Sequence, residues 1–237
     1  MINQIPNLFT LSNLFCGCCT LVFLLRGQPE MVPWLLAGSF LFDYGDGMTA
    51  RALGICSPLG KELDSLADVV SFGVVPGAML YVMLEKLLGG QEPSGFVCLS
   101  SLPAFILSAC AAMRLGKFNI DTRQTTYFIG LTTPATTVFV LGLFLTAQTD
   151  YLGLASIILH PILLYTLIPV LCYLMLSEIP MFGMKIKGLS LKDNRINLLF
   201  LGVFVLVAIV LKPLALSAII ILYILASLIW PEKIRNG

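Results

Sequence analysis

The stretch that decides the fold runs from Asp43 to Asp68 and is DYGDGMTARALGICSPLGKELDSLAD. It holds four aspartates in a chain that is 58% hydrophobic and only 11% charged. Residues at offsets of 0, 3, 4, 7 and 8 share one face of a helix, and so do residues at offsets of 0, 4 and 8. Two polar helical faces are therefore predicted. The first holds Asp43, Asp46, Gly47, Ala50 and Arg51, and the second holds Gly60, Asp64 and Asp68.

On both sides of this stretch the chain has the composition of a membrane protein. The mean hydropathy of the 237 residues is +0.95, which lies outside the ordinary soluble range. Apolar segments of roughly 17–25 residues, the length that crosses a bilayer, recur along the whole chain. We expect an all-α integral membrane protein, a polytopic helical bundle that forms a single domain over residues 1–237. About eight spans are expected, at 8–25, 31–53, 66–88, 94–115, 127–147, 151–176, 196–211 and 213–230.

The basic residues predict the orientation of these spans. Of the 14 Lys and Arg residues, only Arg26, Lys86 and Lys212 fall on one side of the expected membrane, and the rest fall on the other. Under the positive-inside rule, both termini and the aspartate stretch are then cytoplasmic. We expect membrane lipids as partners and no nucleic acid.

Four carboxylates so close together would repel one another unless cations neutralise them. Carboxylate oxygens suit hard cations, so Mg²⁺ or Mn²⁺ is the expected cofactor. A pair of such ions about 3.5–4 Å apart clamps the attacking and leaving oxygens of a phosphoryl displacement. Gly47 and Ala50 would let a nucleotide or pyrophosphate approach the helix, and Arg51 can grip phosphate oxygens.

Written as D-x2-D-G-x2-A-R-x8-G-x3-D-x3-D, the stretch resembles the signature of the CDP-alcohol phosphotransferase family at all eight defined positions. The resemblance implies a membrane enzyme with a six-helix core, acting as a homodimer. Such an enzyme moves a phosphatidyl or substituted phosphoryl group from a CDP-linked donor to an alcohol and releases CMP. At the positions that match the family signature, the resemblance implies that Asp43, Asp46 and Asp64 are metal ligands. It implies that Asp68 is the general base and also a ligand. Gly47, Ala50 and Arg51 would contact the nucleotide and its phosphates.

The segment RLGKFNIDTRQTTYFIGL, residues 114–131, resembles the branch of that family that makes phosphatidylserine from CDP-diacylglycerol and L-serine. Thr132 stands where that branch usually has proline, while Pro134 is kept. The branch implies CDP-diacylglycerol and L-serine as substrates and the cytoplasmic membrane of a prokaryote as the location, with the active site facing the cytoplasm.

An acceptor serine carries a carboxylate, an ammonium group and a hydroxyl. Our hypothesis is that Arg123 or Lys117 meets its carboxylate and that Asn119 or Asp121 meets its amine. Near the N-terminus, Asn7 and Thr10 are candidates for contacts to the nucleotide or its ribose. A helix N-terminal cap is equally compatible with either residue.

Two alternatives stand beside this hypothesis. Within the enzyme class, the acceptor could be glycerol 3-phosphate or inositol phosphate, although a phosphorylated acceptor needs more cations than residues 119–123 supply. Outside it, a cation channel or transporter would explain intramembrane aspartates but not Arg51 or the glycine and alanine spacing. A non-catalytic lipid-binding scaffold would need no proton acceptor at Asp68.

Overall fold

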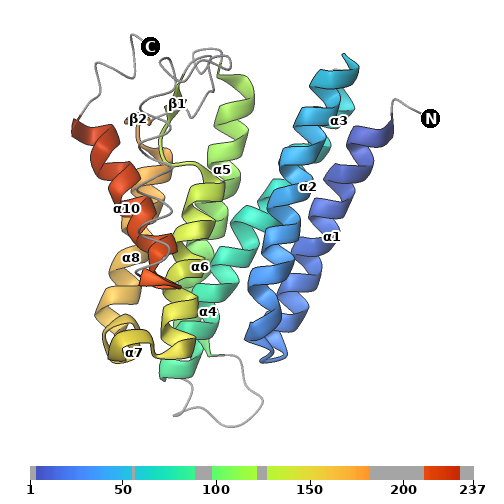
Figure 1. Cartoon of the computed structure of the whole chain (residues 1–237). Helices are drawn as coiled ribbons and strands as arrows, with labels where there is room; N and C mark the ends of the chain where they lie inside the picture. The colour runs from blue at the N-terminus through green and yellow to red at the C-terminus, as the bar shows by residue number, and fades with distance from the viewer. Residues whose placement is uncertain (1–3, 55–56, 89–97, 122–126, 182–210, 230–237) are drawn as a thin grey trace.

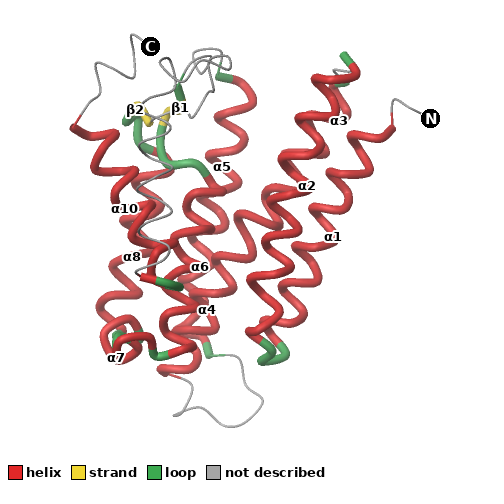
Figure 2. Tube along the Cα trace, in the orientation of Figure 1, coloured by secondary structure: helices red, strands yellow, loops and turns green. Residues whose placement is uncertain are grey.

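The computed structural model describes residues 4–54, 57–88, 98–121, 127–181 and 211–229. Figure 2 shows that helices make up nearly all of this part of the chain and that two short strands lie together at one end. The α-helices are α1 (Ile5–Leu25), α2 (Val32–Leu53), α3 (Pro58–Asp68), α4 (Val75–Leu88), α5 (Ile106–Ile120), α6 (Thr133–Thr149), α7 (Ala155–Ile158), α8 (Pro161–Leu176) and α10 (Leu214–Ile229). The remaining elements are 3-10 turns at Pro29–Met31, Leu99–Phe105 and Tyr151–Gly153, a π-helical segment at Val69–Val74, and strands β1 (Phe128–Ile129) and β2 (Pro180–Met181).

The all-α membrane class is confirmed. Within the described ranges, three helices are long and apolar enough to cross a membrane: Ile5–Leu25, Pro58–Leu88 and Leu99–Ile120. α8 and α10 are shorter apolar helices. Large apolar side chains such as Phe15 and Trp34 are exposed by 69% and 75%, which suits contact with lipid.

The helices form two groups joined by one long helix. α1 packs along α2 and α3, whereas α5 packs on α8 and α10 packs on α6. The continuous helix Pro58–Leu88 crosses from the first group to the second (Figure 1). The start of α1 and the end of α10 lie at the same end of the bundle, together with the end of α5 and the strand pair (Figure 1).

This long helix changes to π-helical hydrogen bonding immediately after Asp68. Pro76 has no N–H to donate to the carbonyl of Phe72, four residues earlier. That carbonyl instead accepts a hydrogen bond from Thr137 Oγ1 at 3.1 Å, and the next carbonyl, of Gly73, accepts one from Ser108 Oγ at 2.9 Å. Hydroxyls of α6 and α5 therefore satisfy backbone groups that lipid could not.

Local chemistry determines where the helices next to the site begin and end. α2 ends at Gly54, whose φ of 64° is a left-handed cap. Ser57 then caps α3 by accepting a hydrogen bond from the Gly60 N–H at 2.9 Å, and Pro58 occupies the first turn. The two polar faces predicted from spacing are present: α2 carries Asp43 to Arg51, and α3 carries Gly60 to Asp68.

Two expected spans differ from the structure, and a third is not tested by it. The expected span 127–147 is a helix only from Thr133, because β1 pairs antiparallel with β2 and Thr132 caps α6. The expected span 151–176 is interrupted, since α7 has four residues and α8 begins anew at Pro161. The expected span 196–211 lies, except for its last residue, outside the described residues.

Candidate active site

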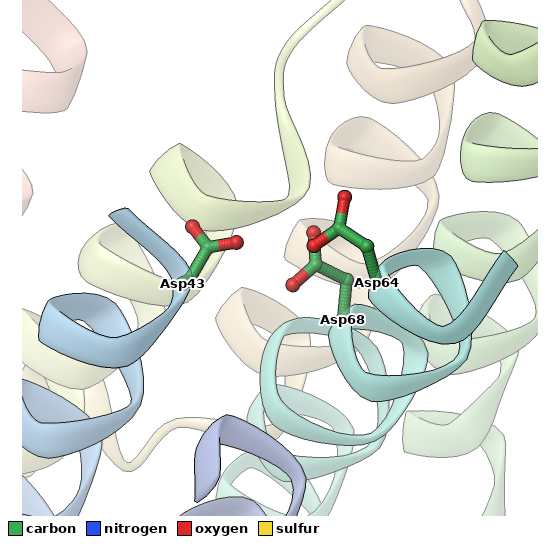
Figure 3. Close-up of side chains that lie close together, drawn as sticks. All are labelled: Asp43, Asp64 and Asp68. Carbon is green, nitrogen blue, oxygen red and sulfur yellow. The ribbon is translucent and has the colours of Figure 1, made fainter. Parts of the chain in front are cut away.

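Three carboxylates converge where the end of α2 faces the start of the long helix. Asp43 projects from α2, and Asp64 and Asp68 project from α3 toward it (Figure 3). Each is partly buried, and one oxygen from each lies within 4.8 Å of the other two. Opposite ligands of one Mg²⁺ ion are about 4 Å apart, so these oxygens need to move little to share an ion.

The donor set fits a hard divalent cation. Asp64 Oδ1 is buried and has no hydrogen-bond partner in the part of the chain that the structure describes. A buried, unpartnered carboxylate oxygen costs folding free energy unless a cation or a donor meets it. Asp43, Asp64 and Asp68 are therefore the residues best placed to hold Mg²⁺ or Mn²⁺.

Asp46 is not part of this group of three. Its side chain is 7% exposed, and its Oδ2 accepts a hydrogen bond from Thr10 Oγ1 at 2.6 Å. Thr10 is on α1, so this bond ties α1 to the polar face of α2. One oxygen of Asp46 remains for another ligand, and its role as a metal ligand stays a prediction.

Asn13, which was not among the residues predicted to form the site, contacts the expected base. Its Nδ2 donates to Asp68 Oδ1 at 3.1 Å, and its side chain is fully buried. Its backbone carbonyl accepts hydrogen bonds from Ser71 Oγ at 3.1 Å and Ser39 Oγ at 3.3 Å. Asn13 thus joins α1, α2 and the π-helical segment. An available signal was its position three residues after Thr10, on the same face of an apolar helix.

A cavity of about 520 Å³ opens beside the carboxylates, between α1, α2 and α3. We call it the motif cavity. Four of the residues predicted to contact the nucleotide or phosphates line it, together with two of the aspartates: Asn7, Thr10, Gly47, Ala50, Asp46 and Asp64. Residues from two distant parts of the sequence therefore meet at one concave surface next to the expected metal site.

Two glycines of the motif are explained by close approaches. A Cβ at Gly47 would lie 3.4 Å from Arg51 Nη1, so the glycine gives the guanidinium room to lie along the face of α2. A Cβ at Gly60 would lie 2.9 Å from Ser57 Oγ and 3.3 Å from Asn7 Oδ1. A side chain at position 60 would therefore disturb both the cap of α3 and its contact with α1.

The residues predicted to bind the acceptor separate in space. Lys117 and Asp121 line a second cavity, of about 360 Å³, at the ends of α5 and α8. Asn119 does not line it: its Nδ2 donates to Ser65 Oγ at 2.7 Å, and its carbonyl accepts from Lys61 Nζ at 2.8 Å. Asn119 therefore faces α3. The prediction for Arg123 lies outside the described residues.

Arg114 begins the segment 114–131 and was expected on the cytoplasmic side of the membrane. In the structure its side chain is 7% exposed, and its guanidinium lies over the Phe118 ring, 5.2 Å from the centroid. It lines the second cavity. At the end of an apolar segment an arginine predicts an interfacial position, so the sequence held no signal of this burial.

Comparisons with known proteins agree with the motif. A family model described as CDP-alcohol phosphatidyltransferase matches residues 3–230. Three similar proteins are each described as a CDP-diacylglycerol–serine O-phosphatidyltransferase. That of Bacillus subtilis (strain 168) is 35% identical over 182 residues, which are 75% of this chain and 89% of that protein. That of Mycobacterium leprae (strain TN) is 35% identical over 146 residues, 59% of this chain and 46% of that protein.

The third, from Saccharomyces cerevisiae (strain ATCC 204508 / S288c), is 36% identical over 151 residues, 56% of this chain and 51% of that protein. The matched region thus spans about half the length of the mycobacterial and yeast relatives and most of the length of the Bacillus relative.

Proposed function

This chain belongs to the CDP-alcohol phosphatidyltransferase family of enzymes, and we propose that it transfers the phosphatidyl group of CDP-diacylglycerol to the hydroxyl of L-serine. The products are phosphatidylserine and CMP. The observation that carries the proposal is the convergence of Asp43, Asp64 and Asp68 beside the motif cavity. The names of the relatives support the choice of both substrates.

Asp43, Asp46, Asp64 and Asp68 would hold two ions of Mg²⁺ or Mn²⁺. Bound there, the ions supply positive charge where negative charge develops on the pyrophosphate oxygens during displacement. Arg51 adds a cation that can bind a phosphate oxygen. Gly47 and Ala50 have little or no side chain, so the pyrophosphate can approach the α2 backbone. Asn7 and Thr10 contact the nucleotide from α1.

Asp68 is the general base of the proposed reaction. It takes the proton of the serine hydroxyl while the serine oxygen bonds to the phosphatidyl phosphorus, and the bond from that phosphorus to the oxygen of CMP breaks. Asn13 supports this role, because its amide holds Asp68 Oδ1 and so restricts rotation of the carboxylate. The second oxygen is left for a metal ion or the incoming hydroxyl.

For the acceptor, Lys117 or Arg123 would meet the serine carboxylate, and Asp121 or Asn119 would meet the amine. The second cavity supports Lys117 and Asp121, since both line it. The hydrogen bond from Asn119 to Ser65 favours Asp121 as the partner of the amine. We further propose a homodimer in the cytoplasmic membrane of a prokaryote, with the carboxylates at the cytoplasmic face.

The test is an acceptor panel with one donor. Purified protein in detergent receives CDP-diacylglycerol, Mn²⁺ and either L-serine, glycerol 3-phosphate or inositol phosphate, and CMP release is measured. Release that depends on L-serine supports the proposal. Release with a phosphorylated alcohol alone would assign a different acceptor. No release with any of them, in protein that still binds the donor, would contradict the enzymatic function.

A further inference from the structure

The π-helical segment Val69–Val74 begins at the residue after Asp68, so it lies between the acidic helix α3 and α4. At its end the Val75 N–H donates to the carbonyl of Val70, five residues earlier. A turn of this kind holds one more residue than an α-helical turn. One residue corresponds to about 100° of rotation around a helix. The segment therefore sets the direction in which α3 faces relative to α4.

The direction of α3 matters because two of the three converging carboxylates belong to it. Asp64 and Asp68 project from α3 toward Asp43 on α2 (Figure 3), and one oxygen from each of the three lies within 4.8 Å of the other two. If an α-helical turn replaced the π-helical one, the acidic face of α3 would turn by about 100° relative to α4. A rotation of that size would carry both carboxylates away from Asp43.

Two hydroxyls from other helices meet the backbone carbonyls of the π-helical segment. Ser108 Oγ on α5 donates to the Gly73 carbonyl at 2.9 Å, and Thr137 Oγ1 on α6 donates to the Phe72 carbonyl at 3.1 Å. The Phe72 carbonyl is the one that Pro76 cannot serve, because proline has no N–H. Pro76→Ala would restore an N–H that can donate to this carbonyl as in a regular α-helix. The hydroxyls and the proline therefore both favour the π-helical turn.

Small residues bring the neighbouring helices close to the segment. A Cβ at Gly77 would meet Ser108 Oγ on α5, and a Cβ at Gly17 of α1 would meet Ser71 Oγ. Ser71 Oγ also donates to the Asn13 carbonyl of α1 at 3.1 Å. α1 and α5 thus both pack closely against the long helix at this point, as helices in membranes do where glycine lies at the contact.

On the basis of the proposed function, we propose that Ser108 and Thr137 are positioning residues for the metal site. By binding two backbone carbonyls they keep the turn after Asp68 π-helical, and this turn keeps the carboxylates of α3 directed at Asp43. They act through the backbone of the long helix and not by contact with a substrate or an ion.

The experiment compares two neighbouring threonines of α6, both fully buried. Thr136 Oγ1 donates to the Thr132 carbonyl of its own helix at 3.1 Å. Thr137 Oγ1 likewise lies 2.9 Å from the Thr133 carbonyl of its own helix, in addition to its bond to Phe72. Thr136→Val and Thr137→Val therefore each remove a bond within α6. Among the described residues, only the second variant also removes a bond to the π-helical segment.

Binding of Mn²⁺ is measured on purified protein in detergent from the electron paramagnetic resonance signal of the unbound ion. The other variants are Ser108→Ala, its combination with Thr137→Val, Pro76→Ala, and Thr137→Ser, which keeps the hydroxyl. For each variant, kcat with L-serine, the KM for CDP-diacylglycerol and the temperature of thermal unfolding are also measured.

Loss of either hydroxyl should weaken the binding of Mn²⁺. Thr137→Val and Ser108→Ala should each raise its dissociation constant by about threefold to tenfold, and their combination should raise it by roughly tenfold to a hundredfold, because hydrogen bonds are lost. Thr136→Val and Thr137→Ser should match the wild type. Pro76→Ala should weaken Mn²⁺ binding without lowering the temperature of unfolding, because proline in the interior of a helix is itself unfavourable.

Equal Mn²⁺ binding by Thr137→Val and Thr136→Val would overturn the proposal, and so would a wild-type protein that binds no Mn²⁺. If the combined variant does not fold, Ser108→Ala alone gives the comparison, since Ser108 is half-buried and its bond joins two helices. A failure of the proposed function looks different, because the wild-type protein would then bind Mn²⁺ but release no CMP with L-serine.

Discussion

The motif cavity and the second cavity differ in how their charged residues are arranged along the chain. The aspartates beside the motif cavity come from one stretch of 26 residues on two consecutive helices, α2 and α3. The second cavity takes Arg114 from α5 and Glu178 from beyond α8, with α6, α7 and α8 between them in the sequence. Helical spacing predicts which residues share a face, but not which distant helices pack together. The first site was therefore visible as a pattern, and the second was not.

Removing divalent cations should have the largest effect and tests whether the motif region needs metal. Treatment with a chelator is expected to abolish CMP release, and added Mn²⁺ or Mg²⁺ should restore it, because three converging carboxylates repel one another without a cation. Asp64→Asn should raise the Mn²⁺ concentration that gives half-maximal activity. Full activity after rigorous chelation would show that the carboxylates act without metal.

Asp68→Asn should lower kcat by roughly 100- to 10,000-fold, since the amide cannot accept the proton of the hydroxyl. The KM for CDP-diacylglycerol should change little if the donor binds mainly in the motif cavity. Steady-state kinetics on the purified variant measure both quantities. Glu30→Gln is a suitable control, because Glu30 is exposed and precedes α2 at the other end of that helix. A kcat within tenfold of wild type would remove Asp68 as the base.

Asn13→Ala tests a residue that positions the expected base but does not itself accept the proton. It should lower kcat by roughly tenfold to a hundredfold through loss of the bond to Asp68 Oδ1, without changing the serine KM. Ser39→Ala is the matched control, since the Ser39 hydroxyl donates to the backbone carbonyl of Asn13 and not to its side chain. If the two variants lose the same kcat, Asn13 serves helix packing alone.

A pair of glycine substitutions compares the two regions directly and should give the smallest effect. Gly60→Ala is expected to destabilise the protein by about 1 kcal/mol, because its Cβ would crowd the Ser57 cap. Gly116→Ala should be neutral or stabilising by up to about 1 kcal/mol, since it lies in α5 and, among the described residues beyond its own helix backbone, no atom lies within 4 Å of its Cβ position. Thermal unfolding in detergent measures both, and equal shifts would contradict the packing difference.

Much of the motif region followed from residue spacing. Of the four aspartates expected to share a metal site, Asp43, Asp64 and Asp68 converge, and Asp46 does not join them. Asn7, Thr10, Gly47 and Ala50 line one cavity beside them. The spacing from Thr10 places Asn13 on the same face of α1, but it does not show that this face meets Asp68. Asn119 was grouped with Lys117 and Asp121 because they are close in sequence, yet it contacts Ser65 on α3.

The limits of hydropathy explain the other differences. Windows of apolar residues predict that a segment is membrane-embedded, but they average over breaks such as the one between α7 and α8. They also cannot show a two-residue strand pair, because β1 and β2 depend on a partner about fifty residues away. The same averaging hides the burial of Arg114 at the end of α5.

By itself, the sequence determined the membrane class, the two polar helical faces and the identity of the acidic groups, because hydropathy and helical periodicity are local properties of the chain. Only the tertiary structure decided which polar atoms meet. It brings Asn13 to Asp68 and places Arg114 and Glu178 around one cavity, because both arrangements depend on how separate helices pack. A contact between residues on different helices is set by the packing of the whole bundle.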